Sequence, residues 1–186
     1  QITEIDVSDR NISSLKGIEV FSSLEKLNCA RNNLTELDVS KNTELTKLYC
    51  GRNQLKTLSL EYNSKLTNLD CSFNRLVTLD LSNKKDLTIL NCESNYLKEL
   101  KLMGSTELMW MYCRNNLLSE LDLSTNIKLK HIDAFDNQLA SIDLRMLADL
   151  EFLNLDWNQL TILDISQNRN ISPIEGAFAA RNNFLE

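Results

Sequence analysis

The stretch LTNLDCSFNRLVTLDLSNKKD, residues 66–86, decides the fold because the chain repeats it. The 21 residues before it read LTKLYCGRNQLKTLSLEYNSK and follow the same pattern, L-x-x-L-x-C-x-x-N-x-L-x-x-L-D-L-S-x-N-x-x. A unit opens every 21 residues, at Leu24, Leu45, Leu66, Leu87, Leu108, Leu129, Leu150 and Ile171. A fixed period of this length indicates a repeat protein, in which each unit is one structural step.

The repeat organises the whole chain. We expect one domain over residues 1–186, with seven complete units at 24–170 and an incomplete unit at 171–186. A 22-residue unit at 2–23, ITEIDVSDRNISSLKGIEVFSS, precedes them and lacks the second Leu-Asp-Leu segment. We therefore predict that this opening unit follows another path, acts as the N-terminal cap and holds the only turn of helix, near residues 15–22.

Each unit contains two short apolar segments, separated by turns that contain Asn and Ser. The alternation in L-x-C or L-x-L places apolar side chains on one side of an extended strand. A unit of 21 residues has no room for a regular helix beside two extended segments, and one unit cannot bury its leucines alone. The sequence therefore predicts a mainly β repeat solenoid, with short parallel strands on one side and extended segments on the other.

The ninth position of every complete unit is Asn. An inward amide at a bend can pair with backbone groups that lack a sheet partner, and an unpaired buried amide costs about 1 to 3 kcal/mol. We predict a structural asparagine ladder that consists of Asn32, Asn53, Asn74, Asn95, Asn116, Asn137 and Asn158.

The sixth position forms a cysteine column of Cys29, Cys50, Cys71, Cys92 and Cys113. Parallel stacking points neighbouring Cβ atoms the same way, the number of cysteines is odd, and no Cys-x-x-Cys pair suits zinc. We expect free, buried and inert thiols.

A mainly acidic column follows the second pair of leucines: Asp38, Ser59, Asp80, Lys101, Asp122, Asp143 and Asp164. Calcium needs about six to eight oxygens in one place, which such a column does not gather. We expect these side chains to face solvent and to bond the turn that follows.

Composition excludes several classes of function. The chain has 186 residues, a formal net charge of −6 and one His. Nucleic-acid binders carry basic faces, and a membrane span needs about 20 consecutive apolar residues. One His and four scattered glycines leave little for catalysis or for cradling a phosphate. We therefore expect no enzyme, no cofactor and no metal site, and neither nucleic acid nor membrane as a partner.

The repeated motif LxxLxCxxNxLxxLDLSxN resembles the leucine-rich repeat family over essentially the whole chain. Its units are similar to the 21-residue bacterial subclass, and ISSLKGIEVFSSL in the opening unit is similar to the 22-residue internalin type. The resemblance implies a right-handed coil and a bacterial protein, exported or at the cell surface, that binds other proteins. We expect a monomer, with any export signal absent from this sequence or already removed.

Recognition is expected where the units differ most, at the outward strand positions three, five, seven and eight. In the first two complete units these positions form a basic patch of Lys26, Arg31, Lys47 and Arg52. From the fifth complete unit onward they form an aromatic surface of Trp110, Tyr112, His131, Phe135, Phe152 and Trp157, edged by Arg114, Asp133, Asp136 and Asp156. Tyr49 and Phe73 complete the predicted partner-binding set.

Exposed aromatic side chains are typical of binding hot spots. The sequence therefore predicts a non-catalytic module that binds an unidentified protein through its strand face. His131 has no Ser or Cys partner with which a catalytic triad could be argued. Three alternatives stay open: the rings shield one another or pack under a further segment, the surface binds a glycan, or the chain is a structural spacer arm of a larger protein.

Overall fold

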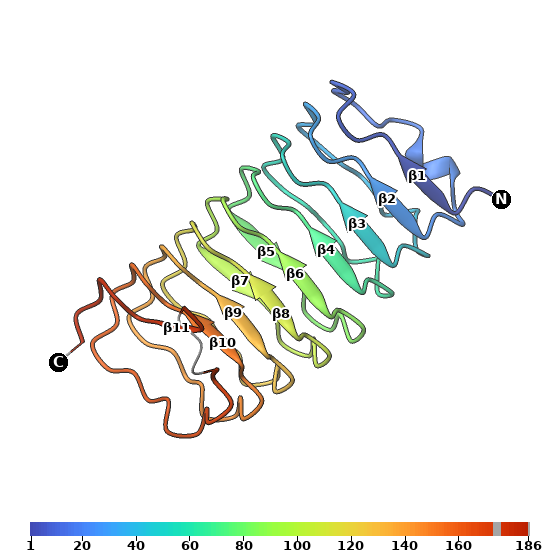
Figure 1. The fold of residues 1–186 in the computed structure, drawn as a ribbon. Coiled ribbons are helices and arrows are strands. Elements are labelled where there is room, and N and C mark those ends of the chain that lie inside the picture. Colours follow the sequence, from blue (N-terminus) through green and yellow to red (C-terminus); the bar gives the residue numbers. More distant parts are fainter. Residues whose placement is uncertain (173–175, 186) are drawn as a thin grey trace.

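The computed structural model describes residues 1–172 and 176–185. The parts of the expected last unit at 173–175 and at 186 lie outside the described residues. Successive coils stack side by side along a rod, with the N-terminus at one end and the C-terminus at the other (Figure 1).

One nine-stranded parallel sheet runs along the rod, in the order β1-β2-β3-β4-β6-β8-β9-β10-β11. Its strands are β1 (Glu4–Asp6), β2 (Lys26–Asn28), β3 (Lys47–Tyr49), β4 (Asn68–Asp70), β6 (Ile89–Asn91), β8 (Trp110–Tyr112), β9 (His131–Asp133), β10 (Phe152–Asn154) and β11 (Phe178–Ala179). From β2 to β10 each strand starts 21 residues after its neighbour, so equivalent repeat positions lie opposite each other in the sheet.

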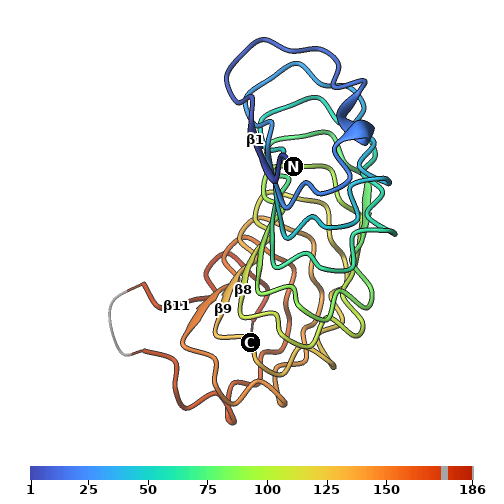
Figure 2. The same ribbon diagram turned by 90° about the vertical axis from the view of Figure 1, so that its right-hand side faces the viewer.

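The other side of the coils consists mostly of extended segments. There β5 (Thr78–Asp80) and β7 (Glu99–Lys101) form a two-stranded parallel sheet. A 3-10 turn, η1 (Ile18–Val20), also lies on this side, in the opening unit (Figure 2). It is the only helical element of the described residues, and it falls within the range predicted for a turn of helix. The prediction of a mainly β solenoid with almost no helix is confirmed.

The leucine and cysteine columns fill the interior as one continuous cluster. Leu27 and Leu48, at the centres of β2 and β3, have no exposed surface, and the five thiols are buried and free. Burial raises the pKa of Cys29 and Cys113 to about 12, so these thiols stay protonated and inert. The prediction of free, buried thiols is confirmed.

The seven ladder asparagines lie at the bends that follow the strands of the large sheet from β2 to β10. Asn74 donates from Nδ2 to the carbonyl oxygens of Cys71 in its own coil and Cys50 in the preceding coil, both at 3.1 Å. Its Oδ1 accepts from the N–H of Leu55, also in the preceding coil, at 3.0 Å. One buried side chain therefore ties two coils together and satisfies backbone groups that the sheet leaves unpaired.

A second column of buried amides, which we did not predict, lies at position nineteen. Its members donate from Nδ2 to carbonyl groups of the preceding coil, and their Oδ1 atoms have no partner in the described chain: Asn42, Asn63, Asn126 and Asn168. The other three complete units have Lys84, Ser105 and Leu147 at this position.

The acidic column faces solvent and bonds the next turn, as expected. Asp80 accepts the N–H of Ser82 at 2.9 Å, and the bond is repeated at Asp38, Asp122, Asp143 and Asp164. Hydrogen bonds from Ser82 hold the pKa of the Asp80 carboxyl below its usual value.

Candidate functional site

The residue before each ladder asparagine has a left-handed backbone. Its φ lies between 51° and 58°, although none of these residues is glycine: Arg31, Arg52, Phe73, Ser94, Asn115, Asp136 and Trp157. The left-handed region costs a residue with a Cβ about 1 to 2 kcal/mol. The ladder bonds fix the bend against this cost, and all seven side chains end up exposed or half-buried at the margin of the strand face.

Position five of the strands has a structural role that we did not predict. Five side chains there accept the backbone N–H two residues further on: Asn28, Asp70, Asn91, Asp133 and Asn154. Tyr49 and Tyr112 occupy the same position and cannot cap the bend in this way. Both tyrosines are half-buried on the strand face, so their rings stay available for other contacts.

Rings from β8, β9 and β10 gather on the strand face. Trp110, His131 and Phe152 lie opposite one another in the register of these three strands. The rings of His131 and Phe152 are parallel, with centroids 4.0 Å apart and 4° between their planes, and the Tyr112 ring lies 4.7 Å from His131 on its other side. His131 therefore lies between two rings, stacked on Phe152 and in contact with a Tyr112 ring that is tilted by 43°.

The surroundings of His131 favour the neutral imidazole. Burial lowers its pKa, and nearby Asp133 opposes this effect only in part.

Two arginines lie over rings of the next coil. The guanidinium carbon of Arg52 is 4.1 Å from the ring centroid of Phe73, and that of Arg114 is 5.4 Å from that of Phe135. Such cation–π contacts contribute about 0.5 to 1 kcal/mol at exposed sites. They hold both arginines along the strand face.

Trp157 is the most open ring of the aromatic surface. It lies just after β10, and 56% of its surface is exposed. Its left-handed backbone, with φ of 58°, places this large apolar side chain at the margin of the sheet.

Two carboxylates do not lie exposed at the edge of the aromatic surface, contrary to the prediction. Asp133 is 8% exposed and caps its own bend, and Asp156 is 3% exposed. Asp156 accepts from Nε of Arg181 at 2.9 Å, in the coil that follows β10. The first carboxylate supports the backbone and the second is paired, so neither offers a free charge to a ligand.

The basic patch lies on β2, β3 and the bends that follow them. Lys26 pairs with Glu4 of the opening unit, with Nζ and Oε1 2.5 Å apart, and this contact raises the pKa of Lys26. Arg31 and Lys47 are exposed and have no ion-pair partner among residues 1–172 and 176–185. Most of the positive charge of the patch is therefore uncompensated within the described chain.

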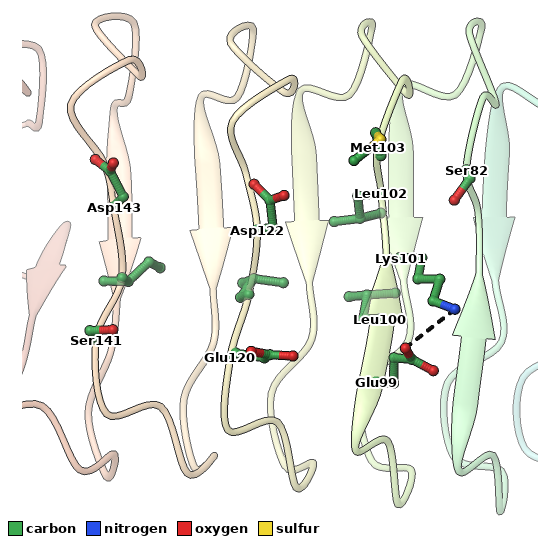
Figure 3. A pocket seen from close by; sticks show the side chains of 12 residues that line it. Ser82, Glu99, Leu100, Lys101, Leu102, Met103, Glu120, Asp122, Ser141 and Asp143 are labelled. Atoms are coloured by element: carbon green, nitrogen blue, oxygen red, sulfur yellow. Dashed lines mark ion pairs between the residues drawn. The ribbon is translucent and has the colours of Figure 1, made fainter.

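The side opposite the strand face carries a shallow hollow of about 640 Å³ across the third to sixth complete units (Figure 3). Leu100 and Leu121 lie at its floor, and Glu99, Glu120 and Asp122 line it. Lys101 pairs with Glu99 at 3.3 Å (Figure 3). Within the described residues, no group of three or more His, Cys, Asp or Glu side chains could hold a metal ion.

Across the described residues we find no helix that is long and apolar enough to span a membrane.

Comparisons with known proteins give structural matches only: no family model and no curated protein matches the chain. The functional domain of InlJ from Listeria monocytogenes, described as including a cysteine ladder, shares 30% identity over 91% of this chain and 47% of that one, with a TM-score of 0.51. Internalin C2 from the same organism shares 23% identity over 100% of this chain and 80% of that one, with a TM-score of 0.79. YopM from Yersinia enterocolitica shares 25% identity over 89% of this chain and 35% of that one, with a TM-score of 0.70.

The repeat pattern and these likenesses define the class: the chain is a leucine-rich repeat protein, with the internalin-like solenoid that the sequence predicted. It spans about half the length of the InlJ domain, 47%, and 35% of YopM. It also carries a column of cysteines, the feature for which the InlJ domain is described.

Proposed function

We propose that the chain is a non-catalytic recognition module that binds another protein through its strand face. The aromatic surface carries this proposal. Its rings come from three neighbouring strands, and Trp157 beside them is 56% exposed. Apolar rings gathered on one exposed face mark an interaction site. Truncating such aromatic anchors weakens binding more than truncating the polar residues around them does. The likeness to leucine-rich repeat proteins supports the same class of function.

The basic patch supplies a second kind of contact. Arg31 and Lys47 carry charge that no residue of the described chain pairs, and Arg52 is held in place over Phe73. A partner with an acidic region opposite this patch would be attracted to it before the aromatic contacts form. The two surfaces lie on the same sheet, so a single partner can contact both (Figure 1).

We further propose a bacterial protein that acts outside the cell or at its surface. The 22-residue opening unit and the likeness to internalin structures support this location. A glycan ligand is the second candidate, since Trp157 offers an open indole. Sugars stack on free ring faces, however, and His131 has a ring on both sides. The rings of His131 and Phe152 cover each other's facing sides, which favours a protein over a sugar as the ligand.

Binding measured with a purified partner would test the proposal. A candidate partner is first captured from host and bacterial surface extracts, and its affinity for variants is then measured by surface plasmon resonance. We expect Trp157→Ala to weaken binding about 30-fold, from a loss of about 2 kcal/mol, mainly through faster dissociation. Loss of Arg31 and Lys47 should instead slow association and reduce its dependence on salt.

Glu36→Ala and Glu120→Ala provide matched controls, because both side chains are exposed on the side opposite the strand face. These two variants should bind as the parent does. If they abolish binding while Trp157→Ala has no effect, the strand face is not the recognition surface. Selective binding of an oligosaccharide on a glycan array, lost in Trp157→Ala, would favour the glycan.

A further inference from the structure

A second hollow, of about 730 Å³, lies between the second and third complete units, on the side opposite the strand face. Hydroxyl groups such as those of Ser59 and Ser82 line it, together with the carboxylates of Glu61 and Asp80. Position fifteen is Ser59 here, whereas the adjacent coils have Asp at that position. The hollow therefore opens where the repeat departs from its own pattern.

Lys84 lies in this hollow and is the only Lys at position nineteen. It is 5% exposed, although it carries an ammonium group. Asn63, one coil earlier, bonds two carbonyl oxygens of its neighbour, at 3.0 and 2.9 Å. The Nζ of Lys84 has no hydrogen-bond or ion-pair partner among the residues that the structure describes. That nitrogen is not one of the enclosed polar atoms without a partner, so it keeps some contact with solvent, and Lys84 lines the hollow.

Other lysines of the described chain are placed differently. Lys101 lies on the same side of the solenoid, in β7, but its side chain is 51% exposed and pairs with Glu99 (Figure 3). Lys85, the next residue after Lys84, is exposed. Burial lowers the pKa of Lys84, and the nearby charges of Asp80 and Glu61 oppose this effect only in part. A larger share of its amine is therefore neutral near neutral pH than for an exposed lysine.

We propose that Lys84 is a covalent modification site for small uncharged aldehydes, which it takes up as a Schiff base. The amine lone pair of Nζ forms a bond to the carbonyl carbon, and the carbonyl oxygen accepts a proton. The nitrogen then loses its protons and the oxygen leaves as water, so the imine forms without oxidation or reduction. Glu61 and Asp80 disfavour anionic carbonyl compounds, and the hydroxyls of Ser59 and Ser82 suit the polar carbinolamine.

Reductive trapping tests the proposal independently of partner binding, because the hollow lies away from the strand face. The intact chain is treated with limiting propanal and sodium cyanoborohydride at about pH 7.5, and labelled lysines are quantified by peptide mass spectrometry. We expect Lys84 to be labelled about threefold or more faster than Lys85, because burial lowers the pKa of Lys84 and leaves more of its amine neutral. When glyoxylate, an anionic aldehyde, replaces propanal, Lys84 should no longer be labelled faster than Lys85.

Two variants keep the test decisive. Lys84→Asn introduces the residue that four of the other complete units have at position nineteen, so it should fold and lose only the fast label. Ser59→Asp adds a carboxylate to the hollow, which should favour the charged amine and slow the labelling of Lys84 while leaving Lys85 unchanged. If Lys84 is labelled no faster than Lys85 in the parent, the proposal is wrong.

Discussion

Replacement of Asn74 by Ala would remove four hydrogen bonds from the middle of the solenoid, but the four losses do not destabilise the fold equally. The carbonyl of Cys50 keeps a bond from Asn53, at 3.0 Å, and the carbonyl of Cys71 keeps one from Asn95, at 3.1 Å. The N–H of Leu55 has Oδ1 of Asn74 as its partner, and it is left unpaired in a fully buried residue. We therefore expect one orphaned donor, which costs about 1 to 3 kcal/mol, plus smaller losses at the carbonyl groups.

The expected destabilisation of Asn74→Ala is about 2 kcal/mol, which lowers the melting temperature by roughly 4 to 8 °C for a chain of this length. Thermal denaturation followed by circular dichroism measures it. Cys71→Ala is the matched control in the same coil, because it removes a buried sulfur atom without orphaning a polar group, at a cost of about 1 kcal/mol. Equal melting temperatures for the two variants would refute the assignment of the ladder as the main polar support of the coils.

Three further predictions concern titratable groups. The pKa of His131 is lowered in the folded chain, so the unfolded chain binds the proton first as the pH falls below about 6.5, and the stability of the fold decreases there. His131→Phe should keep the ring stack and show a smaller loss in melting temperature between about pH 7.5 and about pH 5. Burial raises the pKa of the Cys29 and Cys113 thiols to about 12, so they should resist iodoacetamide in the folded chain and react once the chain is unfolded. Alkylation of the folded chain as fast as the unfolded chain would contradict their burial. Asp143 should titrate with a pKa of about 2 because Arg145 donates to its carboxyl group, and an NMR titration of Arg145→Ala should find it closer to the ordinary value.

Much of the fold follows from the sequence because each unit repeats one physical solution. The leucine and cysteine positions recur every 21 residues, so a single assignment of inward and outward positions holds along the whole large sheet. The helical turn at Ile18–Val20 was predictable because the opening unit lacks the segment that the other units share.

The sequence was less informative where one residue type serves two purposes. The Asn column at position nineteen lies in turns whose composition also suits exposed loops, so its burial was not evident from Asn42 or Asn63. The capping role of Asp133 and the pairing of Asp156 with Arg181 were also missed. The pattern D-x-F at 133–135 could have indicated the cap, but the contact with Arg181 depends on the degenerate last coil.

The two-sheet arrangement shows a further limit. The segments 78–80 and 99–101 pair as strands, whereas the equivalent segments of neighbouring units have nearly the same sequence and are not strands. These two units have Lys84 and Ser105 at position nineteen, and each has a left-handed residue in the next turn, Asn83 or Gly104. Such local departures from the repeat depend on how adjacent coils pack against each other, which the sequence of one unit does not determine.

The left-handed residue before each ladder asparagine has a consequence for how readily this solenoid can acquire new specificity. Arg52, Phe73, Ser94 and Trp157 share nearly the same backbone geometry, with φ from 51° to 58°, although their side chains have little in common. The path of the chain at this point is thus insensitive to the side chain it carries. Exchanges among these positions could alter what the surface selects while the scaffold stays the same, so the repeat is an adaptable framework for engineering and for divergence between copies.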